Sequence, residues 1–102
     1  MRKYKVEIRG LAEDDLLHLY QTIATEAGTA VAGDYVDRIE AACLALETSP
    51  LRCTRRDDIL PGLRTVGFER RATIVFRVHG SRVSILRIFY GEQDFERALT
   101  GR

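Results

Sequence analysis

Two amphipathic segments joined by a two-residue break constrain the fold of this chain more than any other feature. They run over residues 11–27 and 30–48. In each segment, apolar residues recur at three- and four-residue steps, which places them on one face of a helix. Gly28 and Thr29 lie between the segments and read as a helix stop followed by an N-cap. So short a connection makes the two predicted helices antiparallel neighbours, a helical hairpin.

The rest of the chain is typical of strands. Residues 4–9 alternate between apolar and polar, as in a half-buried strand. Three further runs, 63–68, 72–79 and 82–89, are separated by short turns and predict an antiparallel meander. Residues 51–62 read as a polar loop. The order β-α-α-β-β-β predicts an α+β fold, a helical hairpin packed on a small antiparallel sheet.

Finer expectations follow from this plan. Because the hairpin reverses the chain twice, the strands at 4–9 and 63–68 are expected to run antiparallel. Residues 92–99 are expected to add a short helix. Six apolar residues are expected to be buried between hairpin and sheet: Ile23, Val36, Ile39, Leu46, Val75 and Leu86.

Length and composition indicate one ordinary globular domain, residues 1–102, with 45% apolar and 30% charged residues. No apolar run approaches the roughly 18 residues of a membrane span. No apolar signal-peptide core follows the basic N-terminus, so we expect a cytoplasmic protein with no membrane partner. Cys43 and Cys53 are too few for a disulfide framework and are expected to be reduced thiols.

Charge is distributed unevenly along the chain, although the net charge is only +1. Residues 51–90 contain nine arginines against three acidic residues, a net of +6, whereas residues 21–50 have a net of −4. Guanidinium groups recognise carboxylates and phosphates bidentately. The basic segment is therefore expected to meet an acidic partner segment or a phosphate backbone. The alternative is a solvated sheet face balanced by acidic residues elsewhere in the chain.

The residue types that carry catalysis or bind metals form no evident cluster. His18, Cys43, Cys53 and His79 fall on four different predicted elements without the paired spacing of metal ligands. The chain has no glycine-rich phosphate loop and no serine nucleophile elbow. We therefore expect no metal, no cofactor and no catalytic residue. The remaining constellation lies on or beside the C-terminal strands: Arg64, Arg71, Arg77, Arg87 and Tyr90.

Nearly end to end, the chain resembles the ParE-like toxins of the RelE/ParE superfamily, from bacterial type II toxin–antitoxin systems. Each matching fragment is weak alone, but together they occur in the right order and at the right separations. The fragments are Tyr-Lys-Val-Glu-Ile at 4–8, Ala-Glu-Asp-Asp-Leu at 12–16, the segments 32–39 and 46–50, Pro-Gly-Leu-Arg at 61–64, and the segments 74–78 and 83–94.

This resemblance implies a choice between two targets. RelE-like members cleave messenger RNA in the ribosome, whereas ParE-like members inhibit DNA gyrase and arrest growth. The C-terminal half has no lysine, and arginine is a poor base because its pKa exceeds about 12. A gyrase inhibitor that stabilises plasmids is therefore favoured over an enzyme. Two alternatives stay open: an RNA endonuclease in which the Tyr90 phenol takes part, and an inactive antitoxin-binding remnant.

The resemblance also implies partners. One is a cognate ParD-like antitoxin encoded by an adjacent gene, whose acidic segment would fold against the hairpin and sheet. The other is DNA gyrase, with no direct sequence-specific binding to nucleic acid. The candidate antitoxin contacts are Leu16, Tyr20, Tyr35 and Arg77, and the candidate target contacts are Arg64, Arg71, Arg87 and Tyr90.

Overall fold

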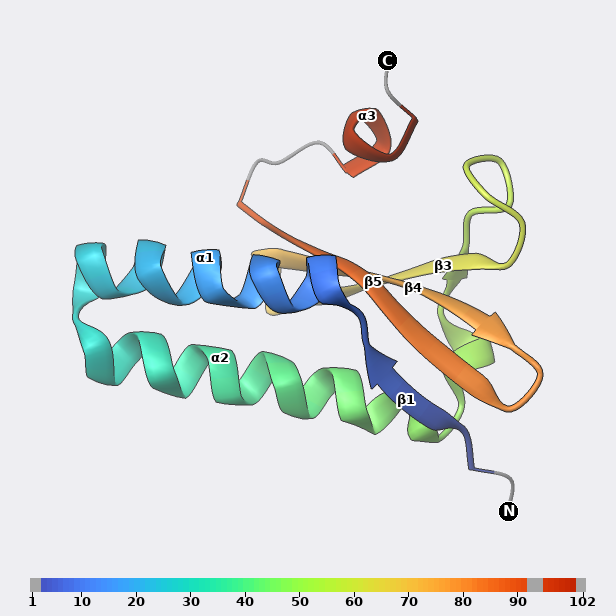
Figure 1. Cartoon of the computed structure of the whole chain (residues 1–102), viewed down its shortest axis with the longest axis horizontal. Coiled ribbons are helices and arrows are strands. Elements are labelled where there is room, and N and C mark those ends of the chain that lie inside the picture. The colour runs from blue at the N-terminus through green and yellow to red at the C-terminus, as the bar shows by residue number, and fades with distance from the viewer. Residues whose placement is uncertain (1–2, 92–94, 101–102) are drawn as a thin grey trace.

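The computed structural model of the chain describes residues 3–91 and 95–100. It is an α+β fold in which helices pack on a five-stranded mixed sheet, and the predicted fold class and helical hairpin are confirmed (Figure 1). The elements are β1 (Lys5–Ile8), α1 (Gly10–Ala27), α2 (Thr29–Leu44), two 3-10 turns (Ala45–Glu47 and Pro50–Arg52), β2 (Thr54–Arg55), β3 (Leu63–Phe68), β4 (Ala72–His79), β5 (Arg82–Tyr90) and α3 (Phe95–Thr100). The expected helix at 92–99 corresponds to α3, and its first three positions lie outside the described residues.

The connection between α1 and α2 is a single residue. Gly28 has a φ of 96° and donates its N–H to the Ala24 carbonyl at 3.0 Å, which ends α1. The Gly28 carbonyl then accepts the N–H of Ala32 at 3.1 Å, so the same residue begins α2. The prediction of Thr29 as the N-cap is wrong because Thr29 is already helical. A glycine is needed here because a positive φ disfavours residues with a Cβ atom.

The sheet has the order β1-β5-β4-β3-β2. The antiparallel meander of β3, β4 and β5 is confirmed, but β1 pairs parallel to β5, with Lys5 opposite Arg82. Since β3 and β5 both run opposite to β4, β1 and β3 share one direction, and the prediction that they are antiparallel is wrong. The reason is β2, a two-residue strand inside the predicted loop that pairs antiparallel to β3. It supplies the chain reversal that the sequence pattern does not reveal.

The hairpin covers one face of the sheet. Ile23, Ile39 and Leu46 are buried in this core as expected, and Val36 is half-buried at its border. α1 packs directly against β5, and α1 and α2 lie side by side along their length (Figure 1).

The placement of Val75 and Leu86 under the hairpin is wrong. Val75 is fully buried on the opposite face, in a second cluster with Leu63 and Phe89, and Leu86 is half-buried beside them. Ile59 and Leu99 cover this second cluster, the latter from α3.

A β-bulge in β5 explains part of this difference. The register passes from Val75 opposite Arg87 to Phe76 opposite Ile85, which leaves Leu86 as the extra residue. The bulge shifts the alternation of β5, so Ile85 and Ile88, three residues apart, both face the hairpin.

Candidate functional site

Four of the nine arginines at residues 51–90 form ion pairs with carboxylates of the described residues: Arg55, Arg56, Arg82 and Arg87. Arg55 pairs with Asp57, and Arg56 binds both Asp58 and Glu96 at 2.9 Å. Arg82 lies 3.6 Å from Glu7. Three of the bound carboxylates, Glu7, Asp15 and Glu96, lie outside residues 51–90 and offset part of the excess positive charge of this segment.

Arg64 is held by the chain itself. Its Nη1 donates to the carbonyl oxygens of Leu51 and Cys53, both at 3.1 Å, and the side chain is half-buried. These bonds fasten the segment that leads into β2 against β3. In the folded chain, Arg64 therefore serves first as a structural anchor.

Arg87 forms a bidentate ion pair with Asp15 of α1. Its Nε lies 2.8 Å from Oδ2 and its Nη2 3.1 Å from Oδ1, and this pairing raises the pKa of Arg87. The same Oδ2 accepts the N–H of Ile88 at 2.8 Å. β1 ends at Ile8, opposite Ile85, so beyond it this edge of β5 has no strand partner within residues 3–91 and 95–100. The Asp15 carboxylate therefore accepts the Ile88 N–H in place of the carbonyl oxygen of a neighbouring strand.

Arg71 and Tyr90, by contrast, lie together at one end of the sheet. Arg71 is exposed, and its pKa is raised first by a hydrogen bond with the Tyr90 side chain. The Tyr90 ring meets Tyr35 of α2 edge to face at 5.7 Å, and Tyr35 meets Phe68 in the same way at 5.6 Å. The Tyr35 hydroxyl is buried without a hydrogen-bond partner among the described residues, and burial raises the pKa of Tyr35.

The turn between β3 and β4 lies beside this aromatic group. Glu69 and Arg70 have φ angles of 50° and 60°, left-handed values that residues with a Cβ rarely adopt. Arg38 of α2 binds Glu69, and its guanidinium lies 5.3 Å from the centre of the Tyr35 ring. We call the polar side chains at this end of the sheet the hairpin-tip cluster: Arg38, Glu69, Arg70, Arg71 and Tyr90.

The structure therefore separates the four predicted target contacts. It brings Arg71 and Tyr90 together in the hairpin-tip cluster, whereas Arg64 and Arg87 are bound to internal acceptors elsewhere. The other members of the cluster, Arg38, Glu69 and Arg70, were not predicted from the sequence. A signal for two of them is present, because a Glu-Arg-Arg turn without glycine or asparagine is unusual between two strands.

The four predicted antitoxin contacts are also distributed unevenly. Leu16 and Tyr35 are buried inside the chain, while Tyr20 and Arg77 are half-buried. Leu17, Tyr20 and Ala24 follow one flank of α1 at helical spacing, and Leu17 is 55% exposed.

Arg77 lies on the face of the sheet opposite the hairpin. Its Nε is buried without a hydrogen-bond partner among the described residues. A Cβ on Gly62 would meet the Cγ and Nε of Arg77 at 3.5 Å. Arg77 also lines a cavity of about 470 Å³ with other charged and polar residues: Glu7, Arg9, His79, Arg82 and Ser84. An acidic group of a partner would find a cationic surface there.

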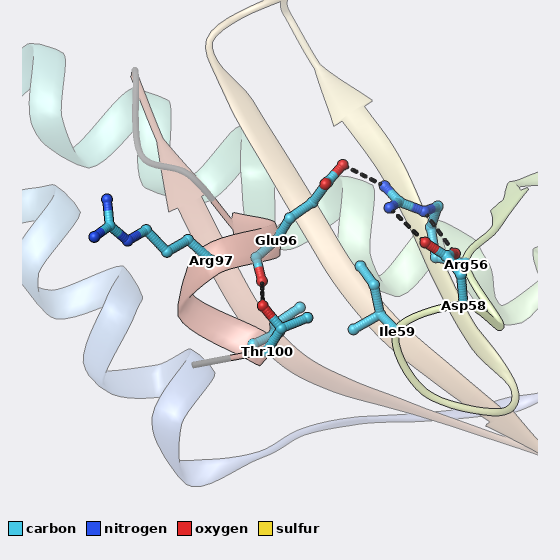
Figure 2. A pocket seen from close by; sticks show the side chains of 7 residues that line it. Arg56, Asp58, Ile59, Glu96, Arg97 and Thr100 are labelled. Carbon is cyan, nitrogen blue, oxygen red and sulfur yellow. Dashed lines mark hydrogen bonds and ion pairs between the residues drawn. The ribbon is translucent and has the colours of Figure 1, made fainter. Parts of the chain in front are cut away.

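A larger hollow of about 850 Å³ separates α3 from the loop at residues 56–59 (Figure 2). Figure 2 shows Arg56 bridging Asp58 and Glu96, which ties α3 to that loop. A smaller cavity of about 280 Å³ lies between α1 and β5 and is lined by His18 and Tyr90, among others. These two side chains are of the types that carry protons in catalysis.

The described residues contain no group of three or more His, Cys, Asp or Glu side chains arranged to hold a metal ion. Within residues 3–91 and 95–100, no helix has both the length and the apolar character needed to cross a membrane.

Comparison with known proteins gives a consistent result. Residues 6–95 match the family described as the ParE toxin of the type II toxin–antitoxin system parDE. The chain is 31% identical over 85 residues to Toxin ParE3 of Caulobacter vibrioides, an alignment that covers 83% of this chain and 84% of that protein.

Two solved structures are similar in fold. A chain of the chromosomal ParDE system from P. aeruginosa superposes with a TM-score of 0.78 at 27% identity, covering 90% of this chain and all of that one. A chain of the toxin–antitoxin complex RelBE2 from Mycobacterium tuberculosis gives a TM-score of 0.62 at 21% identity, covering 86% of this chain and 98% of that one.

Proposed function

This chain belongs to the ParE toxin family of type II toxin–antitoxin systems, and we propose that it arrests growth by binding and inhibiting DNA gyrase. The observation that carries this proposal is the family match over residues 6–95. The internal hydrogen bonds of two arginines support it. Arg64 and Arg87 are each held by internal acceptors, so neither is free to stabilise charge on a scissile phosphate.

A second candidate function is RNA cleavage, and one observation favours it. His18 and Tyr90 line the same cavity. Cleavage at a 2′-hydroxyl needs one group to remove a proton and another to supply one, and imidazole and phenol are able to do so.

Two assays of the purified toxin separate these functions. The first measures DNA supercoiling by gyrase, and the second measures cleavage of ribosome-bound mRNA. We expect inhibition of supercoiling and no mRNA cleavage by the parent chain. Tyr90→Phe keeps the ring and is expected to change inhibition little, whereas loss of a proton-transferring hydroxyl lowers a cleavage rate about a hundredfold or more. Cleavage by the parent that falls in this variant would establish the nuclease instead.

Neutralisation by a cognate antitoxin encoded by an adjacent gene is the other half of the proposal. The flank of α1 formed by exposed Leu17 and half-buried Tyr20 and Ala24 offers apolar anchors, and Arg77 offers a guanidinium to an acidic residue of the antitoxin. Apolar anchors at helical spacing together with a charged pair that fixes register are typical of peptide recognition.

A co-purification experiment tests the antitoxin contact. The neighbouring gene product is co-expressed with the parent chain, with Leu17→Glu and with Leu11→Glu. Leu11 is 62% exposed and lies on a different flank of α1, so it is a matched control. We expect Leu17→Glu to reduce recovery of the complex at least tenfold and Leu11→Glu to leave it unchanged. Equal recovery in all three would remove this flank from the interface.

A further inference from the structure

The turn at the tip of the β3–β4 hairpin is built in an unfavourable way. The Arg71 N–H donates to the Phe68 carbonyl at 3.1 Å, and the two central residues, Glu69 and Arg70, both have positive φ angles. This geometry is that of a type I′ turn, which asparagine and glycine fill most easily. Backbone strain of this kind persists where the surrounding structure enforces it, and it concentrates at functional sites.

The residues on either side of Arg70 are held by side-chain contacts. Glu69 is bound by Arg38 of α2, and Arg71 is hydrogen-bonded to Tyr90 of β5. Arg70 stands between them, exposed, and makes no hydrogen bond or ion pair with the residues that the structure describes. The strained turn therefore exposes the Arg70 guanidinium between two residues whose side chains are held in place.

We propose that this hairpin tip is the surface through which the toxin binds its cellular target, with Arg70 as the central contact to a carboxylate of an acidic protein surface. The proposal rests on the chain being an active toxin, but not on gyrase being the target. It adds to the predicted contacts Arg71 and Tyr90 the residues that hold them in place.

The arrangement of charge favours a protein over a nucleic acid as the partner. Arg38, Arg70 and Arg71 are interspersed with the acidic residues Asp34 and Glu69. Such a mixed surface complements another folded protein, whereas a phosphate backbone selects continuous positive charge. The Tyr35 ring beneath the tip is buried, so it offers no flat face on which a base could stack.

The decisive variant is Arg70→Gly. Glycine relieves the strained φ and removes the guanidinium while leaving every other side chain in place. A merely structural turn would become more stable with unchanged activity. We expect a raised Tm and unchanged antitoxin binding, together with at least tenfold weaker inhibition. Inhibition is scored as the inducer level that halts growth and, for the purified toxin, as the concentration that inhibits its target.

Arg52→Ala is the matched control, because Arg52 is an exposed arginine in a 3-10 turn away from the hairpin tip. It is expected to halt growth at the parent's inducer level.

The proposal is overturned if Arg70→Gly has the parent's potency or if both variants lose potency equally. It is also overturned if the parent chain halts no growth. If the parent halts growth without inhibiting gyrase, the target assignment fails and the growth comparison still decides the role of the tip. Binding of a labelled RNA oligonucleotide that disappears in Arg70→Gly would assign the tip to a nucleic acid and overturn the acidic-protein partner.

Discussion

The carboxylate of Asp15 accepts hydrogen bonds from Nε and Nη2 of the Arg87 guanidinium and also from the backbone N–H of Ile88. The Asp15 side chain is 13% exposed and that of Arg87 27%, so the pair is largely shielded from water. It joins α1 to the edge of β5 where β1 no longer covers that edge. The pair therefore fastens the helical hairpin to the sheet.

Replacing Asp15 should weaken this attachment measurably. Asp15→Ala leaves the Arg87 guanidinium and the Ile88 N–H without their acceptor, and we expect the free energy of unfolding to fall by about 1–3 kcal/mol. Asp14→Ala is the matched control, since Asp14 is an exposed neighbour on α1. Urea unfolding followed by circular dichroism measures both. Equal stability of the two variants would show that the pair contributes little.

The two thiols should differ sharply in reactivity. Burial raises the pKa of Cys43 to about 12, so almost no thiolate forms near neutral pH, and the side chain is fully buried. Cys53 is half-buried, and Arg64 opposes the upward shift of its pKa that burial causes. We expect a thiol reagent at pH 8 to modify only Cys53 in the folded chain and both residues in denaturant. Labelling of native Cys53→Ser at the rate of the parent would contradict this.

Stability should also fall at alkaline pH. From the ordinary thiol pKa of 9.0 up to about 12, Cys43 keeps its proton in the folded chain and loses it in the unfolded chain. The unfolded state then binds fewer protons, so the free energy of unfolding declines with rising pH, by about 1.4 kcal/mol per pH unit for this group. Tyr35, with its raised pKa, acts in the same direction above pH 10.0. Cys43→Ala should show a shallower decline in urea titrations from pH 8.5 to 11, and an unchanged slope would exclude Cys43 as a source.

Gly62 is expected to tolerate no side chain. Its φ is +81°, a backbone conformation that residues with a Cβ rarely adopt, while an added Cβ would make only ordinary van der Waals contact with Arg77 at 3.5 Å and the Val78 carbonyl at 3.7 Å. Gly62→Ala should lower the free energy of unfolding by about 1 kcal/mol or more. Gly67, in β3, has no atom within 4 Å of an added Cβ and serves as the control. The comparison is made by thermal unfolding, and a Gly62→Ala Tm at or above that of Gly67→Ala would contradict the prediction.

The contact between α3 and the sheet should be easy to open. It rests on Leu99 against the second cluster and on the ion pair between Glu96 and Arg56, in which Glu96 is largely exposed. Leu99→Ala is expected to raise amide hydrogen exchange in residues 96–100 while leaving β4 protected. Glu96→Gln should have a smaller effect, because exposed ion pairs contribute little to stability. Exchange that spreads into β4 would show that α3 unfolds only together with the sheet.

Periodicity in the sequence was enough to predict the hairpin and the three meander strands. It failed at β2, because a two-residue strand such as Thr54–Arg55 has no alternation to detect and exists only through its pairing with β3. It failed again at Val75, since the run 74–76 is apolar throughout and both faces of β4 are covered. A continuous apolar strand does not show which of its residues faces the helices.

The candidate site was only half predictable for a related reason. Composition identified the arginines, but their partners lie far away in the chain: Asp15 is 72 residues from Arg87, and Glu96 is 40 residues from Arg56. Which arginines remain free depends on these long-range pairings. The strain at Arg70 is likewise a property of the turn geometry, and its residue type alone would not reveal it.

The parallel pairing of β1 with β5 has a consequence for how the toxin is made. Lys5 lies opposite Arg82, and among the described residues β1 has its only strand partner in β5, which is synthesised after the other four strands of the sheet. Until β5 emerges, α1 and α2 have no complete sheet to cover, and their apolar stripe remains exposed. The ion pair between Asp15 and Arg87 likewise forms only after Arg87 has been synthesised. A fragment that ends before β5 lacks the strand that pairs with β1 and packs against α1, so β5 closes the core and the fold is completed only once that strand has been made.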